Sequence, residues 1–403
     1  MKTKISKFGE DFLKLALRID KHNKGYVDFY IGPEYIYQIV ANEPILSPKT
    51  LLYNCKTLIK QLGAHGFETN RENYLVKTIT AMKTWVEILL GFEMPFKDLI
   101  LGLHDTLLQP INDSVIYKMK EEFDSAHDGP GTLETRMKDL RMRRTITGKN
   151  VLPLFKNALR IVKDKTYELF IDLLPEEERI NIDLVEHKES EVKWSYSEKY
   201  IGNFCSIIAI NPKYNMYWTS FLASSAHEGY PGHHTEFVLK DLFLYNRSSQ
   251  FEHSILLLNS PKLIISEGIA EIAINVLFDY REQAEIGLSE FCLNKIKEDS
   301  LEKIIKQTSV RRKVGFILYN LGYYALVKKW SQTKLFRYAN AFEIYSKEDV
   351  KNQLQLLNDP VLSTTTFSYY LGSKLIMDKY GEFPSVKNFK KLLINPILPS
   401  DLI

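Results

Sequence analysis

Histidines and a glutamate gather in one short segment of the chain, SSAHEGYPGHHTEF. Three of the nine histidines, His227, His233 and His234, fall within eight positions, and Glu228 directly follows the first of them. A hydrolytic zinc site has three protein ligands and one open position for water. It also needs a carboxylate that accepts a proton from that water. The segment therefore predicts a hydrolytic metal site, with a ligand and a base side by side at His227 and Glu228.

The spacing of the histidines leaves the second imidazole ligand open. In the common HExxH pattern two histidines lie one helical turn apart, but the fourth position after His227 is Pro231. On a straight helix at about 100° per residue, a seven-residue step returns to the same face and favours His234. Pro231 and Gly232 predict a kink instead, and a kink could bring His233 round to the site. Both histidines remain candidates on this reasoning.

A third ligand is predicted further along the chain, in PKLIISEGIAEIAINVLFDY. The apolar residues of this segment follow a helical stripe: Ile265, Ile269, Ile272, Ala273 and Val276. Glu267 and Glu271 lie four residues apart, on one face of the same helix. A carboxylate on an apolar helix is costly to bury unless it is paired, and a bound cation is such a partner. Glu267 is therefore the candidate third ligand, and Glu271 is a candidate for orienting a histidine.

Helices are expected to carry most of this site. Apolar spacing and turn signals predict helices over 47–63, 68–91, 112–127, 132–143 and 150–172. Residues 181–187 alternate as a strand does, and residues 193–210 predict a β-hairpin with its turn at Gly202-Asn203. After residue 216 the pattern is helical almost to the end. The sequence predicts a mainly α fold with a small β-sheet immediately before the metal motif.

The composition is that of a globular protein. The chain has 403 residues, of which 45% are hydrophobic and 26% are charged, and these values argue against disorder, collagen and coiled coil. The net charge of +3 makes no case for binding nucleic acid. No stretch approaches the roughly 20 apolar residues of a membrane span. The three cysteines are widely spaced without a CxxC pair, which favours a reducing compartment, and we expect a cytoplasmic protein.

Two motifs of the chain together resemble a known family. HEGYPGHH followed by SEGIAE is similar to the signature of the bacterial family called domain of unknown function 885, which looks related to the gluzincin-type zinc metallopeptidases. The glutamate and alanine spacing of the gluzincin third-ligand motif is found at Glu267 and Ala270. FSYYLGSKLI resembles the Tyr-x-x-Gly helix of the family, which places its tyrosine at Tyr369, and residues 210–218 resemble the segment before the metal motif.

The resemblance implies a zinc hydrolase that acts on peptide bonds. On its alignment, His227, His233 and Glu267 hold one Zn²⁺ per chain, Glu228 is the general base, and Tyr369 donates a hydrogen bond to the oxyanion. The implied fold is a helical metallopeptidase-like fold with a small β-sheet next to the active-site helix. We expect a helical N-terminal region over 1–175 and a catalytic zincin-like region over 176–403, which could form one integrated domain.

Two other functions are compatible with the same motifs. One is a metal-dependent hydrolase that acts on a non-peptide amide or ester, and the other is a non-catalytic relative that acts as a binding module. A binding module is disfavoured because no ligand or base is missing from the motifs. For a peptide or small amide substrate, the strand around 204–210 is the predicted edge on which an extended chain would pair.

Overall fold

The fold is mainly α-helical. The structure, a computed structural model, describes residues 5–185, 195–293, 300–359 and 363–403. Helices dominate this part of the chain and the strands form only small sheets, which confirms the predicted fold class. Within the described residues, no helix combines the length and the apolar character that crossing a bilayer requires.

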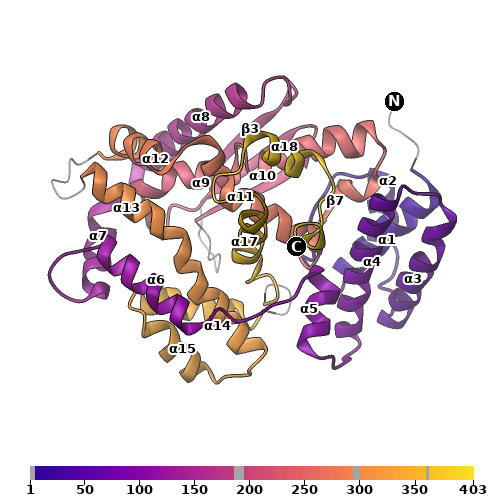
Figure 1. The fold of residues 1–403 in the computed structure, drawn as a ribbon. Helices are drawn as coiled ribbons and strands as arrows, with labels where there is room; N and C mark the ends of the chain where they lie inside the picture. The colour runs from indigo at the N-terminus through magenta and orange to yellow at the C-terminus, as the bar shows by residue number, and fades with distance from the viewer. Residues whose placement is uncertain (1–4, 186–194, 294–299, 360–362) are drawn as a thin grey trace.

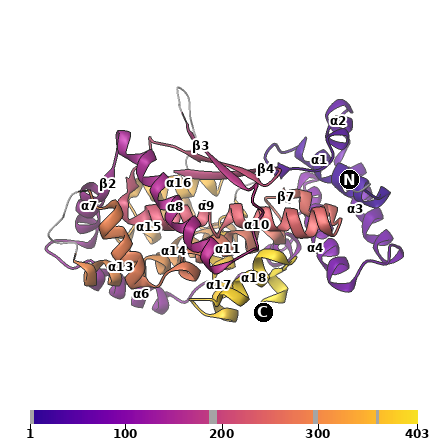
Figure 2. The same ribbon diagram turned by 90° about the horizontal axis from the view of Figure 1, so that it is seen from above.

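One group of helices comes from the first quarter of the chain and gathers at one end of the molecule (Figures 1 and 2). Its helices are α1 (Lys7–Asp20), α2 (Glu34–Asn42), α3 (Pro48–Gln61), α4 (Thr69–Leu89) and α5 (Phe96–His104). Their apolar faces enclose a core of their own around Phe12, Leu75 and Trp85. The predicted helices 47–63 and 68–91 are confirmed as α3 and α4.

A second group lies at the opposite end of the molecule (Figure 1). Its helices are α6 (Asp113–Ala126), α7 (Leu133–Arg144), α13 (Leu301–Arg311), α14 (Gly315–Leu326), α15 (Gln332–Asn340) and α16 (Lys347–Leu356). The group encloses another apolar cluster around Phe123, Ile317 and Phe342. The predictions over 112–127 and 132–143 are confirmed as α6 and α7.

The central helices lie between these groups and contain the metal motif. They are α8 (Val151–Leu169), α9 (Phe221–Glu228), α10 (His233–Lys240), α11 (Pro261–Leu277), α12 (Tyr280–Ile286), α17 (Ser368–Tyr380) and α18 (Val386–Ile394). Helix α11 is buried along nearly its whole length, with Pro261 at its first turn. It packs against α9 on one side and α17 on another. The prediction over 150–172 is confirmed as α8.

A three-stranded sheet lies beside α9 and α10. Its strands are β3 (Arg179–Leu184), β4 (Tyr196–Gly202) and β5 (Cys205–Ile210). Strands β4 and β5 form the predicted hairpin. Positions 186–187 of the predicted strand and 193–194 of the predicted hairpin lie outside the described residues. The prediction that the strand around 204–210 is an edge is wrong, because β3 pairs with β5 in parallel on its other side.

Two further strand pairs join distant parts of the chain. They are formed by β1 (Val27–Tyr30) with β7 (Ile255–Leu257), and by β2 (Thr145–Ile146) with β6 (Met216–Tyr217). Both pairs are antiparallel. Strand β7 is fully buried and interrupts the helical pattern predicted after residue 216. Strand β1 follows α1, and β7 lies shortly before α11, so this strand pair links the amino-terminal helices to α11.

Candidate metal centre

The metal motif folds as two short helices with a tight break between them. Helix α9 ends at Glu228, and α10 begins at His233. Gly232 sits in the break, where its N–H donates to the Ala226 carbonyl at 3.0 Å. A Cβ atom on Gly232 would lie only 2.0 Å from the His227 carbonyl oxygen. The close approach therefore requires glycine, and it places the last turn of α9 beside the first turn of α10.

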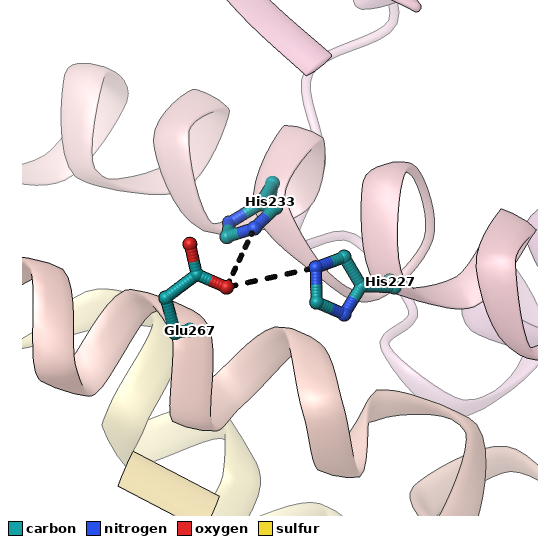
Figure 3. A group of neighbouring side chains, drawn as sticks. All are labelled: His227, His233 and Glu267. Carbon is teal, nitrogen blue, oxygen red and sulfur yellow. Dashed lines mark ion pairs between the residues drawn. The ribbon is translucent and has the colours of Figure 1, made fainter. Parts of the chain in front are cut away.

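This break brings His227, His233 and Glu267 together from three helices (Figure 3). Oε2 of Glu267 lies 3.7 Å from Nε2 of His227 and 3.7 Å from Nε2 of His233. The two imidazole planes are nearly perpendicular, at 88°. One ligand atom of each of the three residues lies within 4.8 Å of the other two.

The geometry of these three residues fits a zinc ion. Tetrahedral zinc with bonds of about 2.1 Å separates its ligand atoms by about 3.4 Å, close to the 3.7 Å observed. Oε2 of Glu267 is buried and has no hydrogen-bond donor, a costly state for a carboxylate oxygen unless a cation compensates it. The surroundings also favour positive charge. Burial lowers the pKa of His233, but Glu267 and then Glu228 and Glu198 raise it to about 10.

Glu271 lies on the other side of the His227 ring. Its Oε1 is 3.6 Å from Nδ1 of His227, while Nε2 of the same ring faces Glu267. A carboxylate at the second nitrogen holds the ring orientation and tautomer of a metal-binding histidine. The structure thus places Glu271 where the sequence predicted a residue that orients a histidine.

The ring of His233 is held by a buried chain of polar side chains that the sequence analysis missed. Nδ1 of His233 lies 3.2 Å from the Ser266 hydroxyl, which donates to Oε2 of Glu236 at 2.6 Å. Lys240 donates to the other oxygen of Glu236 at 2.5 Å. Burial raises the pKa of Glu236, but Lys240 and the Ser266 hydroxyl bring it below its usual value. A charged Glu236 therefore fixes the Ser266 hydroxyl, and with it the His233 ring.

His234 points away from this cluster into a separate buried network. Its Nε2 lies 2.7 Å from Oε2 of Glu178 and its Nδ1 lies 2.7 Å from the Ser206 hydroxyl, so both ring nitrogens have partners. Tyr167, Tyr230 and Lys163 also donate to Glu178. Burial raises the pKa of Glu178, but its donors, His234 first, lower it to about 2. The structure therefore brings His233, and not His234, to His227 and Glu267.

Tyr369 reaches the cluster because two glycines let α11 and α17 touch. A Cβ on Gly372 would lie 2.0 Å from the Ile264 carbonyl oxygen, and a Cβ on Gly268 would lie 2.4 Å from the Gly372 backbone. Tyr369 is one turn before Gly372, and its ring stacks near His227 with centroids 6.1 Å apart and planes at 18°. The charge of Glu267, followed by burial, holds the pKa of Tyr369 well above its usual value, so the hydroxyl remains a donor.

A large cavity opens at this cluster. Its volume is about 1500 Å³, and its walls include His227, Glu228, Glu271 and Tyr369. Glu228 is half-buried at the cavity wall. The half-exposed ring of Tyr369 therefore faces the interior of a cavity. This arrangement leaves room for water and for a substrate beside the candidate ligands, as a catalytic metal site requires.

Comparisons with known proteins identify a similar fold but no family. No protein-family model matches the chain, and no curated protein matches it. The chain is similar to a solved structure from Colwellia psychrerythraea that is described as a "putative lipoprotein". The two share 14% identity with a TM-score of 0.56, over 92% of this chain and 68% of the other. At this identity the similarity shows the fold alone, and the resemblance to domain of unknown function 885 stays a prediction.

Proposed function

We propose that the protein is a zinc-dependent hydrolase that cleaves peptide bonds. One observation carries the proposal: a buried Glu267 oxygen without a donor lies 3.7 Å from an imidazole nitrogen of each of two histidines. The size of the cavity favours a peptide over a small amide or ester, because about 1500 Å³ exceeds the roughly 300–1,000 Å³ of typical small-ligand sites.

His227, His233 and Glu267 would hold the zinc ion. Bound zinc would supply a water of lowered pKa and would polarise the scissile carbonyl. Glu228, at the end of α9, would act as the general base that accepts a proton from the attacking water and passes it to the leaving amine. The Tyr369 hydroxyl donates a hydrogen bond to the carbonyl oxygen as negative charge develops there. Glu271 and Ser266 keep the two imidazoles in their ligand orientation.

Metal analysis combined with a Glu228→Gln substitution tests the proposal. The purified protein should contain about one zinc per chain and should cleave a panel of quenched fluorescent peptides. Glu228→Gln should keep the zinc and lose roughly 10²–10⁴-fold in rate, whereas His233→Ala should lose the zinc. Glu285→Gln, which changes an exposed glutamate on α12, is the matched control and should change neither. Absence of zinc together with unchanged hydrolysis by Glu228→Gln would refute the proposal.

The same panel is extended with non-peptide amides and esters. Cleavage of these compounds but not of peptides would support a metal-dependent hydrolase that acts on a non-peptide substrate. Zinc binding without turnover of any member would instead support a binding module.

We also propose that the protein works in the cytoplasm. Cys55 and Cys205 are buried and form no disulfide, as is usual in a reducing compartment. The fold neighbour is described as a "putative lipoprotein", which points the other way. Cell fractionation decides between them, and recovery of the protein in the membrane fraction would contradict a cytoplasmic location.

A further inference from the structure

One face of α9 forms part of the wall of the large cavity. The residues of and just before this helix that line the cavity are Trp218, Thr219, Leu222, Ala223, Ser224, His227 and Glu228. Most of them recur three or four positions apart, as residues on one helical face do. The metal ligand and the base are at the carboxyl end of this face, and Trp218 and Thr219 are at its beginning.

Three arginines, which we call the arginine cluster, gather near the beginning of α9. Arg311 donates to the Thr219 carbonyl at 3.0 Å. The buried guanidinium of Arg144 lies over the Trp218 ring, 5.6 Å from its centroid. Arg141 donates to the carbonyl of Ile344 at 2.7 Å.

The arginine cluster lines a smaller cavity of about 270 Å³ that adjoins the large one. The two cavities share wall residues, among them Thr219, Thr308 and Arg311. Among the described residues that line the smaller cavity, there is no aspartate or glutamate. His127 also lines it, and burial lowers the pKa of this histidine to about 4, so the histidine adds no charge. The positive charge at this wall therefore comes from arginine.

We propose that the arginine cluster binds a carboxylate of the substrate, with Arg311 as its direct contact. This inference rests on the proposed peptide hydrolysis and deepens it. Arg311 lines both cavities, and a guanidinium is the side chain best suited to a carboxylate because it can donate two parallel hydrogen bonds. The wall of the large cavity includes the carboxylates of Glu228, Glu271 and Asp359, whereas the described wall of the smaller cavity has none. The charges therefore direct the anionic part of a substrate towards the beginning of α9.

The length of α9 sets which bond is cut. Thr219, in the 3-10 helix Trp218–Ser220 directly before α9, and His227 are eight residues apart, and at about 1.5–2.0 Å per residue these helical segments separate them by about 12–13 Å. An extended peptide advances about 3.3–3.6 Å per residue. A carboxylate held by the arginine cluster consequently lies about three to four residues beyond the scissile bond. It is either the terminal carboxylate of the peptide or the side chain of an acidic residue at that distance.

N-acetylated alanine peptides test this carboxylate site. Peptides of four to eight residues are compared with free and with amidated C-termini, and a third set is amidated but carries one glutamate at varied positions. The wild-type protein should cleave carboxylate-bearing peptides about 10- to 100-fold better in kcat/KM than neutral ones, mainly through KM. Mass spectrometry should show the cut three or four residues before the carboxylate.

Arg311→Gln should abolish this preference, and Arg311→Lys should keep part of it because lysine retains the charge without the fork. Arg143 is an exposed arginine on the same helix as Arg144. Arg143→Gln is therefore the matched control and should keep the full preference for carboxylate-bearing peptides. Thermal unfolding of each variant checks that it is folded. The free-acid and glutamate peptides then tell whether the carboxylate is terminal or a side chain.

Two outcomes separate the failure of this inference from the failure of the proposed function. Peptide hydrolysis that ignores the carboxylate in wild type and in Arg311→Gln overturns the carboxylate site and leaves the hydrolase standing. If no peptide is cleaved, calorimetric binding of the same peptides to the wild-type protein decides. If the wild-type protein binds the carboxylate-bearing peptides more tightly than the neutral ones and Arg311→Gln removes this difference, the carboxylate site is supported although the hydrolase proposal has failed. If the wild-type protein binds the carboxylate-bearing and the neutral peptides equally well, the carboxylate site is overturned too.

Discussion

Replacing Gly372 with alanine should separate α17 from α11. The new Cβ would lie 2.0 Å from the Ile264 carbonyl oxygen, while ordinary contact begins at about 3.4 Å, so the backbones must move apart by about 1.4 Å. Overpacking of this kind typically costs about 1–3 kcal/mol of the free energy of unfolding. At Gly63, where a Cβ meets nothing within 4 Å, alanine should instead add about 0.4–1 kcal/mol, because it restricts the unfolded chain.

The same displacement should reach the candidate site through Tyr369, one turn away from Gly372. A misplacement of about 1 Å can lower a rate by roughly 10², so Gly372→Ala should lower kcat about 100-fold, while Gly63→Ala leaves it unchanged. Urea unfolding gives the stabilities of both variants, and steady-state kinetics on the best peptide of the panel gives kcat. If the two alanine variants change stability in the same direction, or if Gly372→Ala keeps its kcat, the glycine contact does not position Tyr369.

Three further predictions concern single side chains around the site. Tyr369→Phe should lower kcat about 10²–10³-fold with little change in KM and in zinc content, and steady-state kinetics with metal analysis checks this. Ser266→Ala should weaken zinc binding about 10- to 100-fold in a chelator competition, whereas Ser225→Ala, which removes a buried hydroxyl without a partner, should leave it unchanged. Glu178→Gln removes the negative charge and replaces one of the two acceptor oxygens by an NH2 group, which faces buried donors, and it should lower the free energy of unfolding by about 3–5 kcal/mol. Because folding lowers the pKa of Glu178 from 4.5 to about 2, urea unfolding should show the whole difference above about pH 5 and a shrinking one as the pH falls towards 2. A difference that is independent of pH would contradict a charged Glu178.

The metal motif shows which features of the candidate site can be predicted from local sequence patterns. The position of Glu267 beside the two histidines was predictable because a carboxylate on an apolar helix needs a partner. Counting along a straight helix favoured His234, but the first helix ends at Glu228 and a new helix begins at His233. The rotation of about 100° per residue therefore cannot be counted through the break from His227 to the later histidines. Proline and glycine in the sequence indicate that a break exists, but they do not give its geometry.

Residues that act over long sequence separations were missed. Ser266 meets His233 from a position 33 residues away, and Glu178 meets His234 from 56 residues away. No periodicity links such positions, since their contact depends on how whole helices pack. The edge prediction for the strand around 204–210 failed for a similar reason. The alternating pattern of β3 predicts a strand, but not that it pairs in parallel with β5.

The pairing of β1 with β7 bears on how the protein is made. Tyr30 pairs with Ile255, which lies 225 residues later in the chain, so β7 is translated long after the other segments at the amino-terminal end. At about 5–20 residues per second, synthesis of the intervening chain takes about 10–45 seconds. During that time the nascent amino-terminal helices carry an open strand edge, and they are exposed to chaperones or to unwanted strand partners until β7 leaves the ribosome.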